Sequence, residues 1–122
     1  MIIDSSSESR TMLKDFLLTN NHDVVYDTYN GFEAVERYFL IQPEIIFLDL
    51  VMNNYDGLTI LKKIRQKDPS SKIIMLTSND KMNILEECVQ LGSLAFISKP
   101  FDFVDVLSTI SFVDETISLQ LS

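Results

Sequence analysis

The chain has 122 residues, 46% of them hydrophobic, so it can bury one core without disulfides or a structural metal. Its net charge of −8 disfavours direct binding of nucleic acid, because contact with the phosphate backbone needs a basic face. No apolar run approaches the roughly 20 residues of a membrane span, and the N-terminus lacks a signal-peptide pattern. We therefore expect one cytoplasmic domain, residues 1–122, whose partners present apolar or basic surfaces.

The first unit of the chain is a short strand followed by an amphipathic helix. Met1–Ile3 is apolar and ends at Asp4, and Ser5 followed by Glu8 has the pattern of a capping box. The helix is expected to end at about Thr19. Four apolar side chains are expected on its inward face: Met12, Leu13, Phe16 and Leu17.

The second unit repeats this order. Val24–Tyr26 is expected to be a strand, and Asn30 with Glu33 repeats the capping pattern before a second helix. Pro43 ends the unit. His22 lies in a polar segment before the predicted strand and is expected to be a solvated turn residue. The inward side chains of the second helix are expected to be Phe32, Val35 and Phe39.

The longest apolar run, residues 44–52, predicts a strand that is buried on both faces. Continuous Ile, Phe and Leu between Pro43 and Asn53 are typical of a strand in a parallel sheet. The run carries Asp49 near its carboxyl end. Ligands of open parallel sheets bind beyond that end, so Asp49 is a candidate site residue. The alternative is that Asp49 caps the following turn.

Two further strand and helix pairs complete the chain. Asp56 with Gly57 opens a helix with Leu58, Leu61 and Ile64 inward, which the loop 67–71 closes. The next strand is Ile73–Leu76, and the helix after it ends at Gly92. The inward face of that helix is expected to contain Met82, Leu85, Cys88 and Val89.

The last strand and helix follow Gly92. Leu94–Ile97 is the fifth predicted strand, followed by Lys99 and Pro100, and the last helix is expected over about 102–115. Cys88 is the only cysteine, which excludes an intramolecular disulfide and a multi-cysteine metal site. Five strands alternating with five helices predict a doubly wound α/β domain with a parallel sheet.

Four polar side chains directly follow predicted strands and should converge on one edge of the sheet: Asp4, Asp49, Thr77 and Lys99. Two carboxylates suit Mg²⁺, while a lysine and a hydroxyl suit a tetrahedral anion. A carboxylate also acts as a nucleophile toward a phosphoryl group, forming an aspartyl phosphate. The alternative is an ion pair between Lys99 and the carboxylates that only fixes the loops.

The chain resembles the receiver domains of two-component response regulators over essentially its whole length. The resemblance rests on these segments: Ile2–Ser5 with Arg10, Phe47–Met52 with Asp56–Leu58, Met75–Ser78, and Ala95–Phe101. It implies a flavodoxin-like (βα)5 fold with the parallel strand order 2-1-3-4-5. It also implies a phosphorelay signalling protein rather than an enzyme, in which a sensor histidine kinase phosphorylates Asp49.

The resemblance also assigns the ligands of Mg²⁺. The metal would be held by Asp4, Asp49 and the backbone carbonyl of Val51, with Ser5 as a further ligand through a water molecule. Ser5 stands where the family has a second acid, so metal binding is expected to be weakened. The family's proline after the methionine is replaced by Asn53, which makes that turn less rigid.

Further roles follow from the same resemblance. Thr77 and Lys99 would contact the phosphoryl oxygens, and Thr77 with Phe96 would form the switch that relays phosphorylation. The relay would reach an effector domain or partner through the fourth helix, fifth strand and fifth helix. The peptide before Pro100 would be cis. The first strand begins at Met1 and is short for the family, so we expect that a domain was excised from a longer regulator or that the start was misplaced.

Other readings depend on single residues. Ser5 favours a phosphorylation-independent pseudo-receiver that acts as an interaction module. A phosphatase with an aspartyl nucleophile would need an acid two residues after Asp49, where Val51 stands. Flavin binding is disfavoured because the first turn lacks a Thr/Gly-rich phosphate cradle.

The last helix indicates an interaction surface. No Lys or Arg occurs from Pro100 to Ser122, whereas the DNA-binding subclass of the family uses basic residues there for its dimer. Its apolar residues exceed the number that one buried stripe requires. We therefore expect this helix to contact a partner or a second copy. The apolar residues of this segment are Phe101, Phe103, Val104, Val106, Leu107, Ile110, Phe112, Val113 and Ile117.

Overall fold

A computed structural model describes residues 1–52, 56–78 and 82–121, with side chains described up to residue 114. Within this part of the chain, the strands form one parallel sheet in the order β2-β1-β3-β4-β5, as predicted. The strands are β1 (Ile2–Ile3), β2 (Asp27–Thr28), β3 (Ile46–Asp49), β4 (Ile73–Thr77) and β5 (Ala95–Ser98). The helices are α1 (Ser7–Thr19), α2 (Gly31–Ile41), α3 (Gly57–Lys67), α4 (Met82–Gln90) and α5 (Phe103–Leu121).

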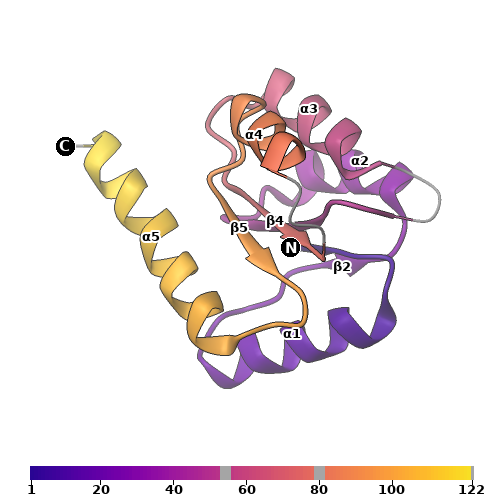
Figure 1. Ribbon diagram of the computed structural model, residues 1–122, viewed down its shortest axis with the longest axis vertical. Coiled ribbons are helices and arrows are strands. Elements are labelled where there is room, and N and C mark those ends of the chain that lie inside the picture. The colour runs from indigo at the N-terminus through magenta and orange to yellow at the C-terminus, as the bar shows by residue number, and fades with distance from the viewer. Residues whose placement is uncertain (53–55, 79–81, 122) are drawn as a thin grey trace.

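Helices cover both faces of the sheet (Figure 1). One face packs against α2, α3 and α4 through Ile3, Ile46 and Leu48 of the strands. The other packs against α1 and α5 through residues such as Ile2 and Phe47. Neighbouring residues of one strand therefore enter opposite layers of the core, because strand side chains alternate between the two faces. The doubly wound prediction is confirmed.

The capping prediction at α1 is wrong by one residue. Ser6, not Ser5, is the N-cap, and its hydroxyl accepts a hydrogen bond from the backbone N–H of Ser9. The carboxylate of Asp4 accepts a hydrogen bond from the backbone N–H of Ser6, with an N···O distance of 2.9 Å. Ser5 lies inside this turn, so the helix begins one residue later than the capping box indicates.

The position predicted for β2 is also wrong. The strand lies at Asp27–Thr28 rather than Val24–Tyr26, because its partner β1 consists of only Ile2 and Ile3. Of the predicted residues, Tyr26 still accepts a hydrogen bond, from the backbone N–H of Ile2. The apolar run predicts an extended segment here, but which of its residues form the strand depends on where β1 pairs with it.

The inward face of α2 was predicted in part: Val35 and Phe39 are half-buried and pack against the core, but Phe32 does not. Phe32 is 66% exposed, and the residues that are buried are Gly31, Ala34 and Tyr38. Tyr38 was not among the residues predicted inward, and its hydroxyl donates a hydrogen bond to Asp68. Three other side chains predicted inward are largely exposed on their helices: Met12, Met82 and Val89.

Several local predictions are confirmed. Asn30 and Asp56 cap α2 and α3 by accepting hydrogen bonds from backbone N–H groups two residues on. Cys88 is buried, and the peptide between Lys99 and Pro100 is cis.

The predicted end of the last helix is wrong, because the helix continues to Leu121 instead of ending near residue 115. Asn53 and the side chain of Ile117, both named above, lie outside the described residues.

Candidate phosphoacceptor site

Asp4, Asp49 and Lys99 meet at the carboxyl edge of the sheet, as the sequence predicts. The Nζ atom of Lys99 lies 2.6 Å from Oδ2 of Asp4 and 3.5 Å from Oδ2 of Asp49. Both carboxylates are buried, and the lysine is largely buried as well. One ammonium group therefore pairs with two carboxylates, and its contact with Asp4 is the shorter of the two.

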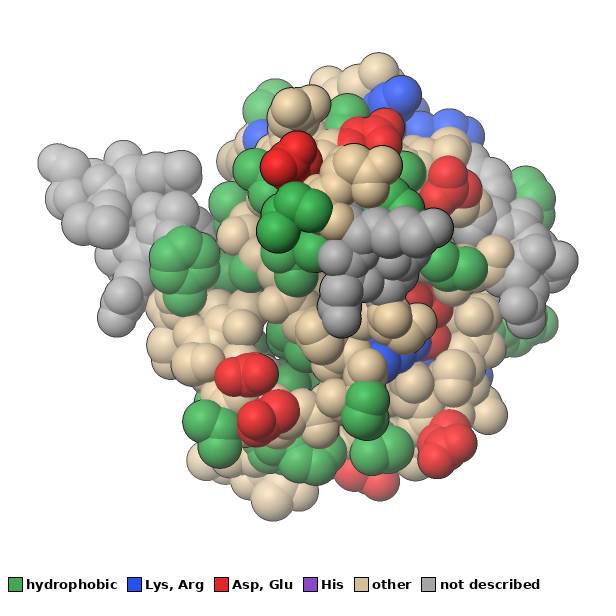
Figure 2. All heavy atoms as spheres, in the orientation of Figure 1, with side chains coloured by type: hydrophobic (Ala, Val, Ile, Leu, Met, Phe, Trp, Pro, Cys, Tyr) green, Lys and Arg blue, Asp and Glu red, His purple; other side chains and the backbone are tan. Residues whose placement is uncertain are grey.

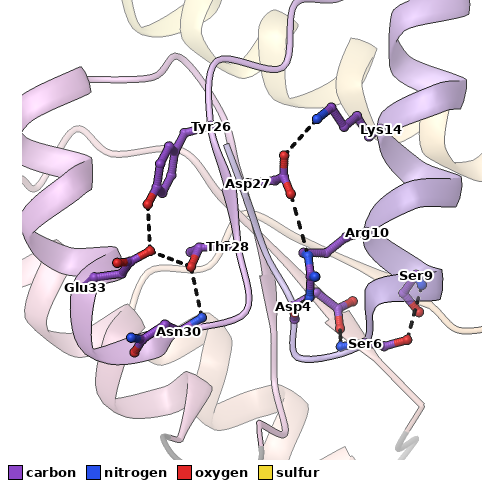
Figure 3. Close-up of polar contacts among 10 residues, drawn as sticks. All are labelled: Asp4, Ser6, Ser9, Arg10, Lys14, Tyr26, Asp27, Thr28, Asn30 and Glu33. Carbon is purple, nitrogen blue, oxygen red and sulfur yellow. Dashed lines mark hydrogen bonds and ion pairs between the residues drawn. The ribbon is translucent and has the colours of Figure 1, made fainter.

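The position of Asp4 is fixed from several directions (Figure 3). It follows β1, which lies between β2 and β3 in the sheet, and is completely buried. One carboxylate oxygen accepts the hydrogen bond from Ser6 described above, and its backbone carbonyl accepts one from Nη1 of Arg10 at 2.7 Å. Nε of Arg10 lies 3.6 Å from Asp27, which also accepts a hydrogen bond from Lys14. The start of α1 and strand β2 thus hold Asp4 in place.

The position of Asp49 depends on a close approach of the following helix. The backbone N–H of Leu50 donates to Leu76 of the neighbouring strand, and that of Gly57 donates to the carbonyl of Leu50. A Cβ atom at residue 57 would lie 2.3 Å from the carbonyl oxygen of Asp49. Only glycine fits at this contact, so the N-terminus of α3 fixes the backbone that carries Asp49.

Burial and a neighbouring acid raise the pKa of Asp49 to about 6. Removal of the carboxylate from water is the largest cause, and the negative charge of Asp4 acts in the same direction. The ammonium group of Lys99 and a hydrogen bond from the backbone N–H of Val51 lower it in part. The site therefore holds more negative charge than Lys99 neutralises, which favours a bound cation.

The structure places the other predicted site residues at the same edge or directly beside it. Thr77 ends β4 and is buried, and its carbonyl accepts a hydrogen bond from the backbone N–H of Lys99 at 2.8 Å. Ser5 is half-buried next to Asp4, and Val51 is exposed. Phe96 of β5 is half-buried against the core layer beneath α2, α3 and α4.

A hollow of about 360 Å³ opens beside Lys99, lined by residues of α1 and of the segment after β5. Sequence reasoning did not identify Ser6 and Gly57 as residues that position the site. The signal for Gly57 was present, because Asp-Gly before an apolar helix was already noted as a helix start. The residues that line the hollow are Glu8, Ser9, Met12, Ser78, Lys99, Pro100 and Phe101.

The donor set fits Mg²⁺. Hard divalent cations prefer oxygen ligands, and two carboxylates lie within reach of one ammonium group. Among the described residues, Oδ2 of Asp4 is buried, accepts no hydrogen bond and pairs with Lys99, so it is available as a metal ligand. Asp4 and Asp49 would hold the ion together with the carbonyl of Val51. Within the described residues, no group of three or more His, Cys, Asp or Glu side chains is placed to hold a metal ion.

Comparison with known proteins shows the family of the chain. Residues 1–111 match the response regulator receiver domain family. The chemotaxis protein CheY of Bacillus subtilis is 36% identical over 111 residues, which are 91% of this chain and 92% of that protein. CheY of Thermotoga maritima is 32% identical over 114 residues, which cover 91% of this chain and 95% of that protein.

Solved structures show the same fold. A chain of the CheX-CheY-BeF3-Mg+2 complex from Borrelia burgdorferi superposes with a TM-score of 0.85 at 29% identity, covering 89% of this chain and 83% of that chain. The signal receiver domain of a modulated diguanylate cyclase from Desulfovibrio desulfuricans reaches 0.87 at 19% identity, covering 98% and 94%. None of the described helices is long and apolar enough to cross a membrane. The chain belongs to the response regulator receiver domains, which are signalling proteins rather than classical enzymes.

Proposed function

We propose that residues 1–122 form one receiver domain in which Asp49 is the phosphoacceptor for a sensor histidine kinase. The observation that carries this proposal is the position of Asp49 at the carboxyl end of β3, 3.5 Å from Lys99 and beside Asp4. A nucleophile, a cation and a second carboxylate are the groups that phosphoryl transfer to an aspartate requires.

In the proposed reaction, a carboxylate oxygen of Asp49 attacks the phosphorus of a phosphohistidine. The new O–P bond forms as the N–P bond breaks, and the imidazole leaves with the electron pair and takes up a proton. Lys99 neutralises charge on the phosphoryl oxygens and the hydroxyl of Thr77 contacts one of them. Mg²⁺, held by Asp4, Asp49 and the carbonyl of Val51, supplies further positive charge when it is bound.

The proposed output is a change of the surface formed by α4, β5 and α5. Thr77 moves toward the phosphoryl group, Phe96 turns further into the core, and the surface then favours an effector domain or partner protein. Thr77 and Phe96 lie on adjacent strands, and Phe96 is half-buried, so part of its side chain is still exposed.

The second candidate is a receiver domain that works without phosphorylation. Ser5 supports it, because a hydroxyl replaces the second acid of the family and weakens any metal site. The ion pair also supports it, because Lys99 lies 0.9 Å closer to Asp4 (2.6 Å) than to Asp49 (3.5 Å). A network of this kind is stable without a phosphoryl group.

Intact mass after incubation with acetyl phosphate and Mg²⁺ separates the two candidates. We expect one phosphoryl adduct that is absent from Asp49→Asn and from a metal-free sample. Ser5→Asp should lower the Mg²⁺ concentration needed for half-maximal labelling by about tenfold, because it restores one anionic ligand. A folded wild-type protein that acquires no adduct, together with a Ser5→Asp variant that does, would establish the second candidate.

A further inference from the structure

The side chain of Arg10 joins the start of α1 to the loop after β1 and to the edge strand β2. Its Nη1 atom donates a hydrogen bond of 2.7 Å to the backbone carbonyl of Asp4, and its Nε atom lies 3.6 Å from Oδ1 of Asp27. Figure 3 shows the guanidinium group between these two residues. The side chain is 16% exposed, and two different nitrogens of one planar group are engaged. The orientation of the guanidinium group is therefore fixed.

Two further groups reinforce the contacts on the β2 side. Oδ2 of Asp27 accepts a hydrogen bond from Nζ of Lys14 at 3.1 Å, so each oxygen of this carboxylate contacts a basic group of α1. The ring centroid of Tyr29, which follows β2, lies 5.7 Å from Cζ of Arg10, a cation–π distance. Strand β2 and the residue after it therefore hold Arg10 in place before any ligand binds.

The contact with Arg10 completes the set of bonds that orient Asp4. The backbone N–H of Asp4 donates to the carbonyl of Thr28 at 3.0 Å, and its Oδ1 atom accepts a hydrogen bond from the backbone N–H of Ser6. Oδ2 lies 2.6 Å from Nζ of Lys99. Without the bond from Arg10, the peptide plane after Asp4 is free to rotate. That rotation would displace the N–H of Ser6 and turn the carboxylate.

We propose that Arg10 is a positioning residue for metal binding: it fixes the backbone of Asp4 so that Oδ2 keeps the orientation in which it binds Mg²⁺. The inference rests on the proposed role of Asp4 as a ligand of Mg²⁺. Replacement of a residue that orients a metal ligand typically lowers metal affinity by about ten- to a hundredfold. Orientation is important at this site, because Ser5 supplies no carboxylate and the anionic ligands are few.

The positive charge of Arg10 acts in the opposite direction to its geometry. A guanidinium group beside the site repels Mg²⁺, so a role through charge alone predicts that Arg10→Gln binds the metal more tightly. A role through geometry predicts weaker binding. Arg10→Lys keeps the charge, but a single ammonium nitrogen cannot replace the planar fork that contacts Asp4 and Asp27 together. The two variants therefore separate charge from geometry.

A Mg²⁺ titration followed by the amide NMR signals of Asp4 and Asp49 measures the dissociation constant without any phosphoryl donor. The chain has a net charge of −8, and Figure 2 shows acidic side chains spread over the surface that it draws, so total Mg²⁺ uptake would include the surface. We expect Arg10→Lys and Arg10→Gln each to raise the dissociation constant by about tenfold. The amide proton of Ser6 should exchange faster with solvent in both variants before Mg²⁺ is added.

Lys14→Gln is the matched control. It removes the same charge as Arg10→Gln, and its ammonium group bonds to the same carboxylate of Asp27 from one turn further along α1. Its dissociation constant for Mg²⁺ should stay within about twofold of the wild-type value. Asp27→Asn, in contrast, removes the acid that orients Arg10 and should weaken Mg²⁺ binding. Added to Arg10→Gln, it should weaken binding no further, because both changes break one chain of contacts.

Several outcomes would overturn the positioning role. A folded Arg10→Lys variant with wild-type affinity for Mg²⁺ would do so, and so would tighter binding by Arg10→Gln. Circular dichroism checks the fold, and if both Arg10 variants unfold, wild-type affinity in Asp27→Asn overturns the role. A wild-type chain that binds no Mg²⁺ overturns it together with the metal site. A chain that binds Mg²⁺ as expected but acquires no phosphoryl adduct overturns only the phosphoacceptor role of Asp49.

Discussion

At the scale of single residues, Asp49 contributes an unfavourable free energy to the unphosphorylated fold. Its pKa is about 6 in the folded chain against an ordinary value of 3.8, so the folded state binds its proton more tightly than the unfolded state does. The stability of the domain therefore falls as pH rises from about 4 to about 6, and the loss is complete above that range.

Asp49→Asn should remove this loss. At pH 7 the variant should be more stable than the wild type by about 1–3 kcal/mol, because a shift of about two pKa units corresponds to roughly 3 kcal/mol and Lys99 loses one partner. Below pH 4 the difference should largely vanish. Urea denaturation at several pH values measures it, with Asp15→Asn on the exposed side of α1 as control. A variant less stable than the wild type at pH 7 would show that the ion pair with Lys99 outweighs burial.

The sequence was sufficient to predict that Asp4, Asp49 and Lys99 lie together at the carboxyl edge of the sheet, but not the energetic balance among them. Asp4, Asp49, Thr77 and Lys99 were predicted because each directly follows an apolar strand. The preference of Lys99 for Asp4 was not predictable, since it depends on how far the lysine side chain extends across β4 and β3. The role of Ser6 as N-cap was missed because the carboxylate of Asp4 accepts a hydrogen bond from the backbone N–H of Ser6, and this turn places Ser5 before the helix.

At the scale of elements, the packing of α3 against the end of β3 requires glycine at position 57. In Gly57→Ala, the added Cβ would lie 2.3 Å from the carbonyl oxygen of Asp49 and 2.7 Å from that of Leu50. The helix must then move away from the strand, and we expect a loss of about 2 kcal/mol or more. Urea denaturation measures it, and Thr59→Ala in the same helix is the control.

The same variant should also slow labelling of Asp49 by acetyl phosphate, because the backbone that carries the nucleophile shifts with the helix. An alanine variant with wild-type stability and labelling would contradict the close contact. Helix starts such as Asn30 and Asp56 were predictable, since capping depends on residues close in sequence. The position of β2 was not, because it depends on a pairing with β1, which is distant in sequence.

At the scale of the whole molecule, one sheet separates two core layers, and both depend on the same strands. Leu13 of α1 and Leu61 of α3 are fully buried on opposite sides of the sheet. Loss of either layer exposes β3 and β4 on one face, so the layers should not unfold separately.

Leu13→Ala and Leu61→Ala should therefore each lower the free energy of unfolding by about 2–5 kcal/mol in one cooperative transition. Two of the four tyrosines, Tyr26 and Tyr38, belong to the layer of α2, α3 and α4, and Tyr29→Phe with Tyr55→Phe as background makes tyrosine fluorescence report that layer, whereas far-ultraviolet circular dichroism reports all helices. The two signals should coincide in both variants. Separate midpoints in Leu13→Ala would show that the α1 and α5 layer unfolds by itself.

The unequal lengths of the strand pairings have a consequence for how the native protein opens. Two residue pairs join β1 to β2, whereas four join β3 to β4. Amide protons of β2 should therefore exchange with solvent through local fraying, while those of β4 exchange only when the whole domain opens. Glu33 accepts hydrogen bonds from the hydroxyls of Tyr26 and Thr28 and so joins the start of α2 to this edge (Figure 3). The hydrogen bonds to Glu33 therefore help to hold β2 in place, and how often they break sets how often β1 becomes exposed at the edge of the sheet.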